Sequence, residues 1–355
     1  MSDWNMLLKK LQTTLAPPGS GVFTVSTGKE KKENLHQKLY GKTEGILEIW
    51  KESLTKLPKE HILVLGIPSD TGGGILRGAN WGPLYLREEL LKLPHLPSFL
   101  DLGDVRTVPF LLHDKYLNDE TIQNVKLAIY QDKNSPYKVS PLSIAEDVCE
   151  DIYLNFKNHK IFGIGGDHSC SYPLVKTYLK AKKKAALIHF DAHTDLLLER
   201  QGIDICFGSW VANILNFLPS PDLCFQIGIR TTARSKEDWE KKFGINQYWA
   251  KEVLKEGPEK ISLDIIHKLK KAKVEELYIS FDLDCLDISY ASATGTPEKG
   301  GLSPFDAVAI IKNIRKEIPV TGADFMELAP HLNGNNLETL LSSGVIASAL
   351  IHSME

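Results

Sequence analysis

The chain has 355 residues, of which 43% are hydrophobic and 25% charged, with a formal net charge of -3 at pH 7. This composition is typical of a soluble globular protein large enough for one big α/β domain or two small ones. The small net charge gives no electrostatic case for binding nucleic acid or an anionic membrane, so a small-molecule partner is the default.

Cysteine usage indicates a reducing compartment. The five cysteines are odd in number and form no C-x-x-C pair, and Met1–Asn5 does not begin a signal peptide. No stretch approaches the roughly 20 apolar residues that a membrane span requires. We therefore expect a cytoplasmic protein with reduced thiols. The cysteines are Cys149, Cys170, Cys206, Cys224 and Cys285.

Residues 1–58 are expected to form an N-terminal extension of unknown role. The sequence predicts a first helix that ends at the Pro- and Gly-containing segment 16–21, and a second helix around 45–50. The charged run 29–33 is interpreted as a solvated face, with a partner-binding site as the alternative.

Residues 59–355 are predicted to form a single domain that carries the chemistry. It begins with a buried strand at 61–66, followed by a Gly-rich loop and a helix that starts at Pro83. The segment Gly72–Gly74 lacks the G-x-x-x-x-G-K-[ST] pattern of a phosphate loop. We interpret it as a wall of a cleft at the strand ends.

Strands and helices alternate through the rest of the chain, after an irregular region that is expected to reach about residue 140. Such alternation is typical of a parallel sheet covered by helices on both faces. Further strands are predicted at 161–165, 185–190, 223–228, 277–281 and 319–322, and helices at 141–158, 171–183, 209–217, 262–272 and 304–317.

Three of these strands end in polar side chains. After the apolar strand that ends at Phe190, the residues Asp191, His193 and Asp195 follow at alternating positions, which point the same way in an extended chain. A solvated acidic turn is the alternative interpretation of this segment. The strand that ends at Phe281 likewise leads into Asp282 and Asp284.

The third strand breaks at a glycine pair, Gly165-Gly166, and then offers His168. Open α/β sheets bind ligands at the C-terminal ends of their strands, so the three strand ends are expected to form one cage. Four carboxylates and two imidazoles without cysteine suit Mn, Mg or Fe(II) better than thiolate-bound zinc. Four negative charges balance two divalent cations.

These segments resemble the ureohydrolase family, which includes arginase, agmatinase and formiminoglutamase. Gly165–Ser169, Asp191–Asp195 and Ser280–Asp284 stand in the order and spacing of that family, and the resemblance covers roughly residues 60–350. It implies a three-layer α/β/α fold with a mainly parallel eight-stranded sheet and two Mn²⁺ per subunit. It also implies hydrolysis of a C–N bond in a small linear amidine or guanidine, by a water that two cations activate.

The resemblance implies roles for individual residues. His168, Asp191, Asp195 and Asp284 resemble the ligands of one metal, and His193, Asp191, Asp195 and Asp282 those of the other. Glu327 matches the family glutamate that receives the cationic nitrogens of the substrate. Asp195 is expected to interact with the tetrahedral intermediate and with the leaving amine.

The chain departs from the family pattern at two places. Arginases and agmatinases carry a His-Gly proton shuttle where this chain has Phe207-Gly208, although formiminoglutamases also lack that histidine. Leu196 and Leu197 stand where arginases bind the α-carboxylate of arginine, so arginine is disfavoured. A formiminoglutamase-like or agmatinase-like substrate is expected instead.

Other candidate residues have a purely structural interpretation beside the functional one. Trp210, with Phe207, either packs against the sheet or lines the specificity pocket. Three arginines could bind a substrate carboxylate or form surface contacts. His189 is expected to be a hydrogen-bonded core residue, and Cys285 a small buried hydrophobe. The arginines are Arg77, Arg230 and Arg234, and Asp167 and Asp287 are interpreted as turn residues or supports for the ligands.

Two other functions compete with the hydrolase. A metal-binding pseudoenzyme that senses a ligand or scaffolds partners would explain Phe207 and the N-terminal extension. A metal-dependent deacetylase on a related fold is disfavoured by the combination of Gly-Gly-Asp-His with D-x-H-x-D. The resemblance also implies a homo-oligomer, a trimer or a hexamer.

Overall fold

The computed structural model describes residues 3–22, 28–334 and 336–355, and within them one mixed sheet of nine strands runs through the molecule. The strands are β1 (Leu15–Ala16), β2 (Ile62–Ile67), β3 (Leu100–Val105), β4 (Lys160–Gly165), β5 (Ala185–Phe190), β6 (Cys224–Ile229), β7 (Asn246–Trp249), β8 (Glu276–Asp282) and β9 (Val320–Met326). Their order is β1-β3-β2-β4-β9-β8-β5-β6-β7. Every pair is parallel except β1 with β3.

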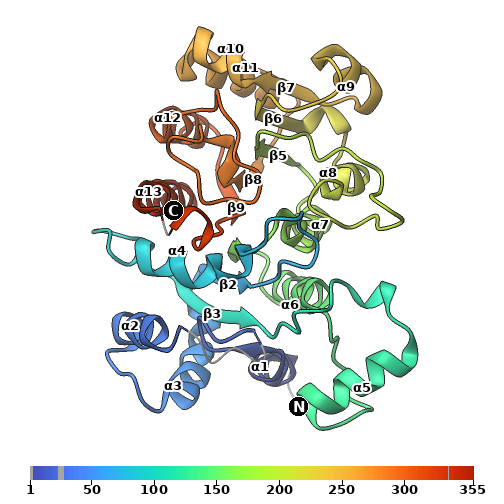
Figure 1. Cartoon of the computed structure of the whole chain (residues 1–355), viewed down its shortest axis with the longest axis vertical. Coiled ribbons are helices and arrows are strands. Elements are labelled where there is room, and N and C mark those ends of the chain that lie inside the picture. The colour runs from blue at the N-terminus through green and yellow to red at the C-terminus, as the bar shows by residue number, and fades with distance from the viewer. Residues whose placement is uncertain (1–2, 23–27, 335) are drawn as a thin grey trace.

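Helices cover both faces of this sheet. They are α1 (Asp3–Thr14), α2 (Lys29–Tyr40), α3 (Ile46–Ser53), α4 (Gly82–Leu90), α5 (Asp119–Tyr130), α6 (Pro141–Asn155), α7 (Ser171–Ala181), α8 (Trp210–Ile214), α9 (Lys236–Phe243), α10 (Ala250–Glu256), α11 (Pro258–Lys271), α12 (Pro304–Arg315) and α13 (Leu337–Ser353). Figure 1 shows α4, α13 and α12 along one face and α6, α7 and α8 along the other. The expected three-layer α/β/α fold is confirmed. In the described part of the chain, no helix is long and apolar enough to span a membrane.

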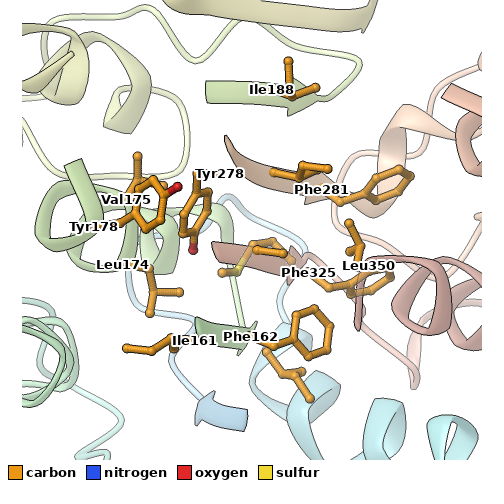
Figure 2. Packing of buried hydrophobic residues seen from close by; sticks show 14 of the residues in the cluster. Ile161, Phe162, Leu174, Val175, Tyr178, Ile188, Tyr278, Phe281, Phe325 and Leu350 are labelled. Atoms are coloured by element: carbon orange, nitrogen blue, oxygen red, sulfur yellow. The ribbon is translucent and has the colours of Figure 1, made fainter. Parts of the chain in front are cut away.

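The central strands are apolar because both of their faces are covered. All residues of β2, β5 and β6 are buried, as expected for strands with helices above and below. Phe190, Phe281 and Phe325 lie side by side on β5, β8 and β9, with ring centroids 5.1 and 5.9 Å apart. Figure 2 shows Phe281 and Phe325 beside Leu350 of α13. These stacked rings align the ends of the three strands. Each ring lies one or two residues before the first polar residue that follows it.

The N-terminal extension packs onto the free edge of the sheet. β1 pairs with β3, and the indole N–H of Trp50 donates to the carbonyl of Leu102 at 3.0 Å. Gly103 has φ +89°, and a Cβ there would lie 2.0 Å from the carbonyl oxygen of Ala16, so only glycine allows this close approach. The expected eight strands are thus β2 to β9, and the extension adds a ninth. The division of the chain at residue 58 stays a prediction.

An ion triad joins α4 to β3 beneath the extension. The guanidinium of Arg87 donates to Asp101 at 2.8 Å and to Asp104 at 2.5 Å, and all three side chains are buried. Asp104 also accepts from the backbone N–H of Gly19 at 2.8 Å. The buried charges are therefore paired, as burial requires.

Some elements differ from the expectations. β3 carries Asp101, Gly103 and Asp104, and β7 begins Asn246-Gln247, so neither has the apolar pattern of a strand. The segment expected to be irregular contains α5, which Asn118 caps by accepting from the N–H of Thr121. The other expected helices occur as α6, α7, α8, α11 and α12, with ends shifted by a few residues. The expected strand that begins at residue 319 continues to Met326.

Candidate metal centre

The predicted polar residues meet at the C-terminal ends of four neighbouring strands, β4, β9, β8 and β5. Level strand ends in a doubly wound sheet form a crevice, which is where such sheets bind ligands. The structure brings the six candidate ligands and Glu327 together there. His168 follows β4, Glu327 follows β9, Asp282 ends β8 and Asp284 follows it, and Asp191, His193 and Asp195 follow β5.

His168 points one ring nitrogen into a group of carboxylates. Its Nδ1 lies 2.8 Å from Oδ2 of Asp282, 3.2 Å from Oδ2 of Asp191 and 3.3 Å from Oδ2 of Asp195. Its Nε2 lies 3.1 Å from Oγ of Ser280, which in turn donates to Asp324 at 2.8 Å. Since Asp324 accepts the Ser280 proton, Nε2 of His168 is the donor, and in the neutral ring the lone pair of Nδ1 faces the carboxylates.

His193 forms a second group. Its Nδ1 lies 3.0 Å from Oδ2 of Asp284 and 3.4 Å from Oδ1 of Asp191. Its side chain is 27% exposed, whereas those of the neighbouring aspartates are almost wholly buried. The cluster therefore reaches solvent on the His193 side.

The distances group these residues differently from the division of ligands that the resemblance implied, and that division stays a prediction. Asp282 lies beside His168 and Asp284 beside His193, which is the reverse of the expectation, and Asp195 lies with His168 rather than with both histidines. Asp191 touches both groups, through its two different oxygens. Alternation along an extended chain predicted one face for Asp282 and Asp284, but β8 ends at Asp282 and Asp284 lies in the short helical turn that follows.

Asp191 is held by a further buried histidine, His189. The side-chain N–H of Gln226 lies 3.0 Å from Nδ1 of His189, so His189 donates from Nε2 to Asp191 at 2.9 Å. His189 lies close enough to His168, Asp191 and Asp195 to be grouped with them geometrically. Because both of its nitrogens are engaged, we interpret it as an orienting residue, in line with the expectation of a satisfied core histidine.

The electrostatics of the cluster suit cations. Burial, followed by neighbouring carboxylates, raises the pKa of Asp195 and of Asp282 well above the usual range. Burial opposes the charged form of His193, but Asp284 and Asp191 raise its pKa to about 12. The Nδ1 of His168 is buried and makes no hydrogen bond of normal geometry. The lone pair of His168 Nδ1 points at carboxylates that repel one another when they are ionised. A metal ion would bind this lone pair and the carboxylates in place of the protons that they otherwise hold.

Glu327 lies against the cluster without belonging to it. Its Oε1 accepts the backbone N–H of His168 at 2.8 Å, and it has φ +67°. Burial and the nearby Asp282 and Asp167 raise its pKa well above the usual range. A buried carboxylate in a strained backbone conformation, with one oxygen uncommitted, is suited to a cationic ligand.

Comparison with known proteins agrees with this geometry. Residues 60–352 match the model of the arginase family. The chain belongs to that family. It is a hydrolase that acts on linear amidines, with a His/Asp cluster able to bind metal.

Several relatives give the same picture. An N(1)-aminopropylagmatine ureohydrolase of Thermus thermophilus is 34% identical, over 76% of this chain and 83% of that protein. The agmatinase of Bacillus anthracis is 24% identical over 86% and 96% of the two chains. The structure of formimidoylglutamase from Bacillus subtilis strain 168 has a TM-score of 0.67 at 21% identity, covering 82% of this chain and 86% of the other.

Phe207, at the position of the family histidine, lines a surface cavity of about 510 Å³ together with Gly72–Gly74 and Arg200. The guanidinium of Arg200 lies 5.0 Å from the centre of the Phe207 ring. The backbone N–H of Phe207 donates to the carbonyl of Gly72 at 3.0 Å, and the N–H of Gly72 donates to Asp167 at 3.0 Å. Asp167 thus ties the glycine loop, as expected of a supporting residue.

The three candidate arginines have other partners. Arg230 donates to the backbone carbonyls of several residues, including Asp284 at 2.7 Å and Glu298 at 3.0 Å, and so holds the loop after β8. Arg77 donates to the carbonyl of Asp70, and the Arg234 guanidinium lies 5.7 Å from the Trp239 ring centre. These contacts are structural, so they do not point to binding of a substrate carboxylate by the three arginines.

Cys285 and Asp287 agree with their structural interpretations rather than with a catalytic role. Cys285 is buried, and burial raises the pKa of its thiol well above the usual range, so it is a poor nucleophile. Asp287 accepts from the backbone N–H groups of Ser289 and Gly300, as a turn residue. Leu196 is buried.

The sequence interpretation missed the residues that support the cluster. Ser280 and Asp324 lie opposite each other on β8 and β9, and Gln226 lies opposite His189 on β6 and β5. Each is a polar residue inside an otherwise apolar strand, and that irregularity was the available signal. Thr296, which donates to Asp284 at 3.0 Å, lies in a loop and carries no such signal.

Proposed function

We propose that this protein hydrolyses a small formimino or guanidino compound at a centre of two Mn²⁺ ions per subunit. The observation that carries the proposal is the lone pair of His168 Nδ1, which faces three aspartates in a buried site. A second histidine faces Asp284 and Asp191 nearby, so the donor set offers two places for cations. Oxygen and imidazole ligands without thiolate suit Mn²⁺.

The contacts indicate which residues would hold each cation. His168, Asp195 and Asp282 would hold one, and His193 and Asp284 the other, with Asp191 between them. A pair of divalent cations supplies a water molecule that loses a proton near neutral pH. The protein supplies the geometry, since His189, Ser280 and Thr296 hold the surrounding groups in place.

Glu327 would bind the cationic nitrogens of the substrate with its free Oε2, while the N–H of His168 holds Oε1. Charge-assisted hydrogen bonds of this kind orient a planar amidinium. Phe207 cannot carry a proton, so Asp195 would pass the proton to the leaving amine. Asp195 and Glu327 are therefore the proposed catalytic residues.

The substrate is proposed to resemble formiminoglutamate or agmatine more than arginine. Leu196 is buried and Leu197 is apolar, so neither can bind an α-carboxylate. The cavity beside Phe207 offers instead an aromatic wall, and the cation of Arg200 would suit a carboxylate at the non-reacting end, as in formiminoglutamate, better than the ammonium of agmatine.

A turnover screen tests the proposal. The protein loaded with Mn²⁺ is incubated with formiminoglutamate, agmatine, guanidinobutyrate and arginine, and release of formamide, urea or ammonia is measured. We expect turnover of one of the first three and little or none of arginine. Absence of bound metal after Mn²⁺ loading, together with no turnover, would contradict the proposal.

A metal-binding pseudoenzyme is the second candidate, and Phe207 in place of the family histidine is the observation that favours it. The exposure of the His193 side chain, however, indicates that solvent reaches the site, and this argues against a pseudoenzyme with a blocked cleft. Tight binding of metal and of an amidine without any turnover would support the pseudoenzyme.

Two further expectations belong to the proposal. All five cysteines are free and buried, which supports a cytoplasmic protein with reduced thiols. The family resemblance suggests a homotrimer or a homohexamer. Sedimentation equilibrium of the purified protein would distinguish these from a monomer.

A further inference from the structure

Trp210, the first residue of α8, lies wholly buried against the metal cluster. Its indole N–H donates to Oδ2 of Asp195 at 2.8 Å. Its ring packs on that of His168 with centroids 4.9 Å apart, and meets that of His189 edge-on at 5.1 Å. From the sequence, Trp210 was expected either to pack against the sheet or to line the specificity pocket.

The hydrogen bond from the Trp210 indole does more than satisfy a buried N–H group, because it also orients a carboxylate. An indole N–H can only donate, and a buried one needs an acceptor. Here the acceptor is a carboxylate, so the bond is charge-assisted and stronger than one to a backbone carbonyl. The accepting oxygen also lies 3.3 Å from Nδ1 of His168, so the bond fixes the Asp195 oxygen that faces the cluster.

Asp195 differs from the other three aspartates in how it is held. Asp191, Asp282 and Asp284 each accept a backbone N–H, from His193 at 2.6 Å, Asp284 at 2.8 Å and Ala192 at 3.0 Å, respectively. Among the residues that the structure describes, Trp210 is the only hydrogen-bond donor to the Asp195 carboxylate. Asp195 also has φ +50°, a left-handed conformation that costs free energy in a non-glycine residue.

We propose that Trp210 is a positioning residue that holds the Asp195 carboxylate in its metal-binding orientation. The proposal rests on the proposed function, because it takes Asp195 as a ligand. Without the indole donor, the carboxylate is free to rotate about its last bond, and the lost order appears as weaker binding of the cation beside His168. Supporting residues of this kind typically change metal affinity about 10- to 100-fold.

Trp50 supplies a matched control. It is also wholly buried, and its indole N–H donates to the carbonyl of Leu102 at 3.0 Å. Trp50 lies on the N-terminal extension at the far edge of the sheet, outside the metal cluster. Trp50→Phe therefore removes one buried indole and one hydrogen bond without touching a candidate ligand.

The test compares Mn²⁺ binding by the wild-type protein, Trp210→Phe and Trp50→Phe, using calorimetric titration of the metal-free proteins. We expect the affinity of one of the two sites to fall about 10- to 100-fold in Trp210→Phe and to stay unchanged in Trp50→Phe. The Mn²⁺ electron paramagnetic resonance spectrum should change only in Trp210→Phe. Equal affinities and spectra in all three proteins would overturn the inference.

An isosteric variant excludes simple loss of packing. Replacing Trp210 with 3-benzothienylalanine keeps the size of the ring system but exchanges the N–H for sulfur. The same loss of affinity is expected, with little change in the thermal stability of the metal-free protein. Normal affinity in this variant would overturn the inference and leave the proposed function standing, whereas a wild-type protein that binds no Mn²⁺ would overturn both.

Discussion

The backbone N–H of His168 donates to Oε1 of Glu327 at 2.8 Å, although the two residues are 159 positions apart. This bond joins the first candidate metal ligand to the proposed substrate-binding carboxylate. β4 and β9 are neighbours in the sheet, so the loops that follow them meet directly. One contact therefore joins the proposed cation site to the proposed amidine site.

Glu327→Gln should abolish most of the activity and leave metal binding intact. The amide keeps the size of the side chain and can still accept the His168 N–H, but it removes the charge that would pair with the amidinium. Loss of one partner of a buried charge pair costs at least about 2 kcal/mol, so kcat/KM should fall by roughly 30-fold or more. Steady-state kinetics and metal content measure the two effects.

The control for Glu327 is Glu338→Gln, because Glu338 is an exposed residue in the first turn of α13. It should retain wild-type kinetics. Full activity of Glu327→Gln would show that the substrate cation binds elsewhere.

Phe207→Ala should raise KM and leave Mn²⁺ affinity unchanged. The variant loses the aromatic wall of the cavity but keeps the backbone N–H that bonds to Gly72. Burying an aromatic ring contributes about 1.5 kcal/mol or more, so the increase in KM should be roughly tenfold or more. Phe305→Ala is the control, since Phe305 is 77% exposed on α12. An unchanged KM in Phe207→Ala would place the substrate away from this cavity.

Arg87→Ala should destabilise the protein by about 3–5 kcal/mol, because it leaves Asp101 and Asp104 buried without their cation. Urea denaturation followed by circular dichroism measures this free energy of unfolding. Lys184→Ala breaks the exposed pair with Glu275 and should cost less than about 1 kcal/mol. Similar losses in both variants would contradict the assignment of the Arg87 triad as a buried support.

Lys176→Met should make stability less dependent on pH in acid. Burial opposes ionisation of Glu146, but His113 and Lys176 lower its pKa to about 2 from the ordinary 4.5. A lowered pKa in the folded state stabilises the protein above pH 4.5, and this stability is lost as the pH falls toward 2. The variant should therefore be less stable at pH 7 by about 1 kcal/mol, after solvent screening.

The pH prediction is checked by urea denaturation of both proteins at pH 7 and at several values between 4.5 and 2. The difference between wild type and Lys176→Met should shrink across that interval. A difference that stays constant would mean that Lys176 acts through packing rather than through the Glu146 charge.

The sequence alone determined the strand ends that carry the chemistry. Alternation along an extended chain predicted that Asp191, His193 and Asp195 converge, and the glycine pair before His168 marked a turn. The three residues do converge, but they follow β5 in an irregular segment in which Asp195 has φ +50°. The fold class followed from alternating strands and helices. These features are local, so the order of residues reveals them.

Only the tertiary structure decided which groups touch. The sheet order places β9 and β8 between β4 and β5, and this order sets Asp282 beside His168 and Asp284 beside His193. It also brings the indole of Trp210 to Asp195. Such contacts depend on how distant strands and helices pack together, and alternation within a single strand carries no information about its neighbours.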